Sequence, residues 1–203
     1  MASVGAFAYS FPGSMDAAVA ANVSPGDNSV KVSSATTNAA GPDGLIGTAD
    51  DIRVTGAVIA ELYDATPSAS FTATTPRLVN VSVLKSIGSG LTAGFVIGGS
   101  SVKTVFVRAI GPTLAAAPFS VADVVADPQL SLYSGQTKIG ENNDWGGTVA
   151  LTAAFAQVGA FALPANAKDA ALLATLAPGN YSVQVSGVAN TSGTALVEVY
   201  ELP

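Results

Sequence analysis

The fold of this chain is decided by the stretch Pro178-Gly179-Asn180-Tyr181-Ser182-Val183-Gln184-Val185-Ser186. The Pro-Gly pair that opens it is typical of a turn, and apolar residues then alternate with polar ones. Tyr181, Val183 and Val185 would project from one face of a strand while the polar residues between them project from the other. The stretch therefore predicts a half-buried β-strand that begins at a tight turn.

The same pattern occurs a second time near the N-terminus, where residues 25–33 read Pro25-Gly26-Asp27-Asn28-Ser29-Val30-Lys31-Val32-Ser33. Around it, residues 5–64 match residues 159–201 in the same order, and Asp16 lies as far ahead of Pro25 as Asp169 lies ahead of Pro178. Residues 76–158 have no counterpart ahead of Gly5. The sequence therefore predicts one complete module and the back half of another.

Alternation of apolar and polar residues continues through the rest of the chain, with Gly and Pro between the alternating runs. Further strands are expected over 79–85, 94–97, 103–110, 129–133, 170–176, 181–186 and 195–200, and short helices over 121–126 and 149–158. This pattern predicts an all-β protein built as an antiparallel β-sandwich or jelly roll. We expect a partial module over 1–64, a linker over 65–75 and the complete module over 76–203.

The composition favours association and excludes one class of partner. Hydrophobic residues make up 49% of the chain and charged residues only 11%, against about 25% charged in an ordinary soluble domain. So few charges protect a monomer poorly against association, although a secreted domain with a neutral polar surface would show the same composition. The net charge of −6 and the eight scattered Lys and Arg residues predict that nucleic acid is not a partner.

The sequence also predicts no membrane span and an extracellular or cell-surface location. Residues 145–167 carry no charge, but Gly, Pro and Asn interrupt them, and the N-terminus has no basic segment followed by an apolar core. We expect that any secretion signal has been removed or was never included. The absence of cysteine leaves the redox compartment open, and the Thr-rich, Lys-poor composition favours the extracellular location.

The partial copy has a physical consequence for its strands. Half of a sandwich leaves unpaired N–H and C=O groups and an uncovered apolar face, here carried by Val30, Val32, Ile59 and Leu62. These strands could pack into the complete module of the same chain, or a neighbouring copy could pair with them by β-augmentation. A head-to-tail contact of the second kind gives filaments unless its rotation closes a ring.

An acidic insertion separates the two matched parts of the N-terminal copy. Asp43, Asp50 and Asp51 lie in a Gly-rich segment, and carboxylate and carbonyl oxygens are the ligands that Ca²⁺ prefers. The spacing differs from that of an EF-hand loop. The alternatives are a Ca²⁺ site and an ordinary acidic turn with Asp43-Gly44 at its tip. We expect that the protein requires no cofactor, and Ca²⁺ is the one candidate.

A second polar cluster surrounds the single tryptophan. Asp127, Asn143 and Asp144 accompany Trp145, and an aromatic ring beside such groups is typical of a glycan-binding platform. The same groups could instead bind Ca²⁺. The structural alternative is that Trp145 anchors its loop to the core.

Catalysis is not expected, because the chain has no histidine and no cysteine. A glycosidase-like carboxylate pair such as Glu141 and Asp144 would need a cleft, which the sequence does not indicate. The segment around Lys103 has a Val before the Lys and a strand after it, so it is not a phosphate-binding loop. Arg108, within that strand, is expected to pair with a carboxylate or to reach the surface.

Several short motifs, taken together, resemble a repeated β-sandwich module of large secreted bacterial surface proteins. They include Gly94-Phe95-Val96-Ile97-Gly98-Gly99, Val107-Arg108-Ala109-Ile110-Gly111-Pro112, Asn142-Asn143-Asp144-Trp145, Gly159-Ala160-Phe161, Asp169-Ala170-Ala171-Leu172, and Glu198-Val199-Tyr200. The back part is similar to the bacterial pre-peptidase C-terminal domain. The resemblance implies a non-catalytic, secreted β-rich module for display, adhesion or assembly, sometimes with Ca²⁺.

These observations lead to one main hypothesis: a non-enzymatic structural subunit of an extracellular bacterial filament or surface layer, which pairs with copies of itself through its strands. The alternative is a carbohydrate-binding or adhesive secreted module with a glycan partner at Trp145. An accessory domain of a hydrolase is a third, weaker interpretation.

Overall fold

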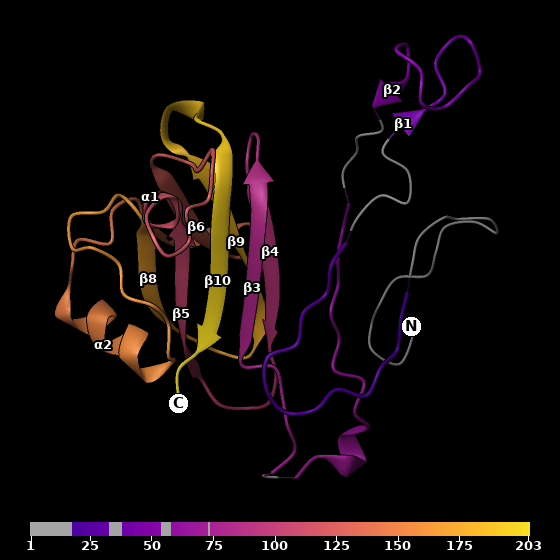
Figure 1. Cartoon of the computed structure of the whole chain (residues 1–203). Coiled ribbons are helices and arrows are strands. Elements are labelled where there is room, and N and C mark those ends of the chain that lie inside the picture. The colour runs from indigo at the N-terminus through magenta and orange to yellow at the C-terminus, as the bar shows by residue number, and fades with distance from the viewer. Residues whose placement is uncertain (1–17, 33–37, 54–57, 73) are drawn as a thin grey trace. The chain divides into compact units, whose positions relative to one another are not determined.

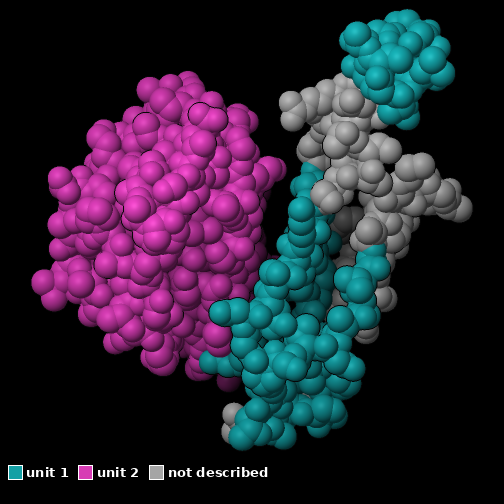
Figure 2. Space-filling view, viewed as in Figure 1, with its two compact units in different colours: residues 1–77 teal, residues 78–203 magenta. Residues whose placement is uncertain are grey.

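The computed structural model describes residues 18–32, 38–53, 58–72 and 74–203. The chain divides into two compact units, residues 1–77 and residues 78–203 (Figure 2).

The unit formed by residues 78–203 is a sandwich of two antiparallel four-stranded sheets (Figure 1). The first sheet has the strand order β3 (Asn80–Ile87), β10 (Gly193–Glu201), β5 (Lys103–Ile110) and β8 (Ala170–Leu176). The second has the order β4 (Leu91–Ile97), β9 (Gly179–Gly187), β6 (Pro128–Ser134) and β7 (Thr137–Asn142). The predicted all-β antiparallel sandwich is therefore confirmed.

Strand β9 contains the stretch that predicted the fold, and it lies between β4 and β6. Val183 and Val185 point into the core between the sheets and are fully buried. Tyr181, on the same face, stacks on Phe95 of β4 with ring centroids 5.7 Å apart. The two-residue alternation thus places its apolar side in the core, as the sequence predicts.

Strand β5 is buried on both faces, which makes it the centre of the unit. Val105, Val107 and Ala109 belong to the core between the two sheets. Phe106 and Ile110 point the other way, into a second apolar cluster that covers the outer face of the first sheet. The unit therefore has three layers: the second sheet, the first sheet, and a layer of helices and loops.

The third layer contains α1 (Pro112–Ala115) and α2 (Val149–Gln157), and α2 lies against β8 (Figure 1). The backbone N–H of Leu151 donates to the Thr148 hydroxyl, which caps the first turn of α2. The predicted helix over 149–158 is confirmed, but the helix predicted over 121–126 is wrong. There, Val124 forms a parallel bridge with Thr194, and the Val125 N–H donates to the Thr194 carbonyl, so the segment follows β10.

Residues 1–77 contain little regular structure in the part that is described. A two-stranded ladder joins β1 (Asn38–Ala39) to β2 (Ile52–Arg53), and a short 3₁₀ turn, η2, spans Ser68–Ser70. Residues 18–32 and 58–67 form no strand. The rest of the predicted N-terminal copy, over 5–17, 33–37 and 54–57, lies outside the described residues, and the partial module stays a prediction.

Candidate functional site: unpaired apolar segments and a buried arginine cluster

Residues 25–33 and 178–186 match in sequence, but their valines lie in different environments. Val30 and Val32 are 71% and 53% exposed, whereas Val183 and Val185, at the matching positions of β9, are 0% and 1% exposed. Full burial of a valine side chain stabilises by about 1.5–3 kcal/mol. Residues 28–32 therefore expose apolar surface that the complete module buries.

The second matched segment repeats this contrast. Residues 58–64 match β10 residues 195–201. Val58, Ile59 and Leu62 are exposed, whereas Ala195 and Val199 are buried in the core. We call residues 28–32 and 58–63 the unpaired segments, because neither forms a strand in the structure.

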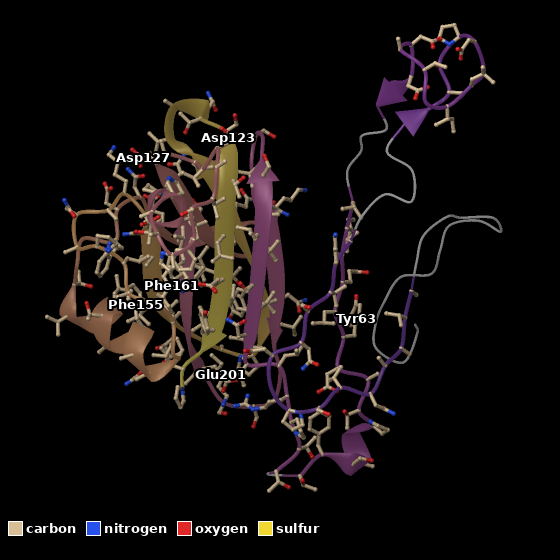
Figure 3. The ribbon with its side chains drawn as sticks, in the orientation of Figure 1. Tyr63, Asp123, Asp127, Phe155, Phe161 and Glu201 are labelled. Carbon is tan, nitrogen blue, oxygen red and sulfur yellow. The ribbon has the colours of Figure 1, made fainter. Side chains whose placement is uncertain are left out.

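The complete module contains a fully buried arginine on the outer face of β5. The Arg108 Nε donates to the Glu198 carboxylate of β10, and Nη1 donates to the Phe161 carbonyl at 2.7 Å. The guanidinium carbon lies 4.1 Å from the centroid of the Phe161 ring and 5.6 Å from that of Phe155. Figure 3 labels these two aromatic residues. The prediction that Arg108 pairs with a carboxylate is confirmed, and the aromatic rings replace water around its head group.

Glu198 is the acceptor that links this cluster together. It accepts hydrogen bonds from the Arg108 Nε, from the Ser82 hydroxyl at 3.2 Å and from the Tyr200 hydroxyl at 2.9 Å. Burial, together with the nearby Glu198 charge, raises the pKa of Tyr200 to about 12. The strands β3, β5 and β10 are therefore tied together by one buried network.

Glu61 and Tyr63 match the acid and the phenol of this network in sequence. The Tyr63 hydroxyl donates to the Glu61 carboxylate at 3.0 Å, and these residues match Tyr200 and Glu198. This hydrogen bond raises the pKa of Tyr63. Both residues are exposed, and within the described parts of the chain no cation pairs with Glu61.

The predicted Ca²⁺ residues lie in the hairpin that β1 and β2 close. The N–H groups of the loop donate to all three carboxylates: Asp43 N–H to Asp50, Leu45 N–H to Asp43, and Gly47 N–H to Asp51. Hydrogen bonds from Thr48 and Asp43 hold the pKa of Asp50 below its usual value. These carboxylates cap turns, and the described residues contain no group of three His, Cys, Asp or Glu side chains arranged to hold a metal. Calcium binding stays a prediction.

The predicted ligand residues around Trp145 do not form one site. Asp127 pairs with Lys168, while Asn143 and Asp144 are exposed on the loop before Trp145. Trp145 itself is only 4% exposed; its Nε1 donates to the Pro164 carbonyl at 2.9 Å, and its ring packs against Phe155. The glycan-platform interpretation is therefore corrected: a sugar needs an exposed ring face, and this ring anchors its loop to the core.

Sequence reasoning missed a second buried acid, Asp169. Its carboxylate accepts from the Gly111 N–H at 2.8 Å and from the Thr113 backbone N–H and hydroxyl, which fixes the segment after β5. Its backbone carbonyl accepts from the Trp145 N–H at 2.9 Å. The repeated Asp-Ala-Ala motif was the available signal, because Asp16 occupies the matching position.

The described part of the chain shows no catalytic arrangement at the carboxylates that the sequence left open. Glu141 pairs with Lys138 on exposed β7, and Asp144 lies on an exposed loop. An open groove of about 580 Å³ between Pro112–Phe119 and Phe161–Ala167 has a mostly apolar lining. None of the described helices is long and apolar enough to cross a membrane.

Comparison with known proteins finds similarity to one solved domain. The chain is similar to the pre-peptidase C-terminal domain of collagenase from Bacillus anthracis, with 15% sequence identity and a TM-score of 0.37. The match covers 60% of this chain and 89% of that domain. The resemblance seen in the back part of the sequence is to the same kind of domain. No family model and no curated protein matches the chain.

Proposed function

We propose that this chain is a non-enzymatic structural subunit of an extracellular filament or surface layer, in which the unpaired segments of one copy pair with strands of a neighbouring copy. The contrast between Val30 and Val32, which are exposed, and Val183 and Val185, which are buried, carries the proposal. Association would cover this apolar surface and pair the backbone groups beside it.

The complete module offers edges that could accept such strands. Strands β3 and β4 are each the last strand of their sheet, so one side of each has no partner strand within the module. Leu84 of β3 and Val96 of β4 are exposed apolar side chains on these edges. A segment of one copy on an edge of the next is a head-to-tail contact, which propagates unless it closes into a ring.

The composition supports the non-enzymatic and assembly parts of the proposal. The chain has no histidine or cysteine, which removes the commonest general base and the thiol nucleophile. Its 11% charged residues fit a protein whose surface is normally covered by neighbours. The glycan-binding alternative depended on an exposed Trp145, so it is not carried further.

The proposal is tested by light scattering after size exclusion and by negative-stain microscopy of the full chain over a range of concentrations. We expect assemblies that grow with concentration. The double variant V30K/I59K should dissociate them, because assembly would bury two charges, while the thermal transition of the complete module is unchanged. A matched control is Val149→Lys, since Val149 is 86% exposed on α2 of the complete module. Monomers at every concentration, or equal loss of assembly in the control, would contradict the proposal.

A further inference from the structure

We infer that the outer edge of β4 is the strand-accepting edge of the complete module, and that residues 28–32 of a second copy pair with it in the antiparallel direction. The inference rests on the proposed function and deepens it, because it selects one edge and one segment. The edge has backbone groups that no strand of the module pairs with, and the segment has valines that face water.

Two of the four sheet edges are unsuited to accept a strand. On β8, the Ala171 N–H donates to the Asn142 side-chain oxygen at 2.9 Å. On β7, Lys138 and Glu141 form an ion pair, and the ladder with β6 has a register shift after Leu132. Charges and bulges are features by which natural edge strands avoid pairing with other chains. The acceptor is therefore β3 or β4, which form the other side of the sandwich (Figure 1).

A lysine on its core-facing side protects the edge of β3. Lys85 lies opposite the buried Ala195 of β10, so its side chain projects to the same side of the sheet as that of Ile87. It is exposed, and the ion pairs among the described residues do not include it. A strand added beside β3 would bury this ammonium group without a carboxylate, which is costly. An inward-pointing charge of this kind discourages strand addition.

The edge of β4 has none of these protective features. Its residues, Leu91–Ile97, include no charge and no proline, and its ladder with β9 has no register shift. Leu91, Ala93 and Phe95 form its core-facing row, yet all three are only half-buried, since β4 is the last strand of its sheet. This edge therefore offers backbone groups together with an apolar row that a further strand can cover.

Residues 28–32 carry the side chains that β4 already accepts from its neighbour in the module. They match residues 181–185 of β9 in sequence, and β9 is the strand that pairs with β4. In that pairing Ala93 lies opposite Val183, and both side chains face the core. Such cross-strand pairs stabilise a sheet. A second strand of the same pattern can therefore add to the free side of β4.

The register of the β4 and β9 pair places each side chain of the segment. In the same register Val30 lies opposite Ala93, and Val32 lies further along the same half-buried row. Lys31 then lies opposite Thr92 on the outer face, where its ammonium group stays in water. Both valines, which are exposed in the structure, become covered, and no charge is buried.

Cysteine cross-linking tests this register, because the chain has no cysteine of its own. Full chains carrying Lys31→Cys and labelled with ¹⁵N are mixed with full chains carrying Thr92→Cys under mild oxidation. We expect a disulfide-linked heterodimer, identified by its mass, since opposing residues of antiparallel strands lie within reach of a disulfide. The matched control is Leu84→Cys, at an exposed position on the outer face of β3, which should give only the background yield.

A second variant tests the protective role of Lys85. Lys85→Val removes the inward-pointing charge from an exposed position of β3. We expect the cross-link between Lys31→Cys and Leu84→Cys to rise above background in this variant, because β3 then also offers an apolar edge. A yield that stays at background would contradict the role given to Lys85.

Two outcomes would overturn the choice of β4: a yield for Thr92→Cys no higher than for Leu84→Cys, or a link within one chain in monomers that carry both Lys31→Cys and Thr92→Cys. Light scattering of the parent chain separates this inference from the proposed function. Assemblies that grow with concentration without a preferred cross-link support the proposed function and contradict the inference. A preferred cross-link in particles that stop at the dimer does the reverse, because the contact then closes on itself.

Discussion

Arg108 shows how much a single buried charge depends on its surroundings. Its side chain is wholly removed from water, yet Nη2 has no hydrogen-bond partner among the described residues, so ring contacts and the Glu198 carboxylate must compensate for the lost hydration. The sequence could predict a carboxylate partner for a lone arginine within an apolar strand. It could not predict full burial, because Phe155 and Phe161 reach Arg108 from segments that lie far away in the sequence.

We expect Arg108→Met to lower the free energy of unfolding of the complete module by about 3–5 kcal/mol, because Glu198 would be left buried without its partner. Adding Glu198→Leu should recover much of this loss, since both charges are then gone. Urea denaturation measures both changes. The exposed pair of Lys138 and Glu141 provides the control, and Lys138→Met should cost far less than Arg108→Met because solvent screens this pair. A similar loss in both single variants would contradict the role given to burial.

Tyr200 should make the module sensitive to alkaline pH. Its pKa is raised from 10.0 in the unfolded chain to about 12 in the folded one, so folding favours the protonated form. The stability that it contributes is complete below pH 10 and is lost as the pH rises through about 12. Tyr200→Phe should remove this part of the alkaline loss, as measured by denaturant midpoints across that range. Tyr133→Phe, on β6, is the control, and a curve unchanged by Tyr200→Phe would contradict the assignment.

Among the elements, the sequence predicted the strands whose apolar residues either alternate with polar ones or follow one another without a break. β9 alternates because only one of its faces lies against a core, whereas β5 is apolar throughout most of its length because both of its faces are buried. β7 was missed because Lys138, Ile139 and Glu141 are exposed, and no alternation marks it. The helix expected over 121–126 failed for a tertiary reason: the segment instead pairs with Thr194 at the start of β10.

The loop before α2 should depend on its tryptophan as an anchor. Trp145→Ala would leave a cavity beside Phe155 in the second apolar cluster, and we expect it to lower the unfolding free energy by about 3–5 kcal/mol. Trp145→Phe keeps most of the apolar contact but loses the hydrogen bond to Pro164, so its loss should be smaller. Thermal or urea unfolding compares the two variants. A Trp145→Ala protein of wild-type stability would contradict this role.

For the molecule as a whole, the sequence predicted the division into a folded sandwich and a preceding segment related to its back half. The structure confirms the sandwich. The candidate site could be predicted only in part. The matching valines of the two segments could be found in the sequence. The hydrogen bond from Tyr63 to Glu61 could not, because its resemblance to the bond from Tyr200 to Glu198 is seen only in the structure. The scarcity of charge and the exposed apolar segments are the two observations behind our proposal that the chain associates through strands.

The central claim is that residues 28–32 and 58–63 are unpaired in the monomer and become paired on association. Hydrogen exchange of the full chain, read by mass spectrometry at dilute and concentrated conditions with the mass of each sample measured by light scattering, tests it most directly. We predict fast exchange of both segments in monomers and slow exchange in assemblies, while β5 and β10 stay slow throughout. Slow exchange of both segments in a strictly monomeric sample, or fast exchange in assemblies, would contradict the account.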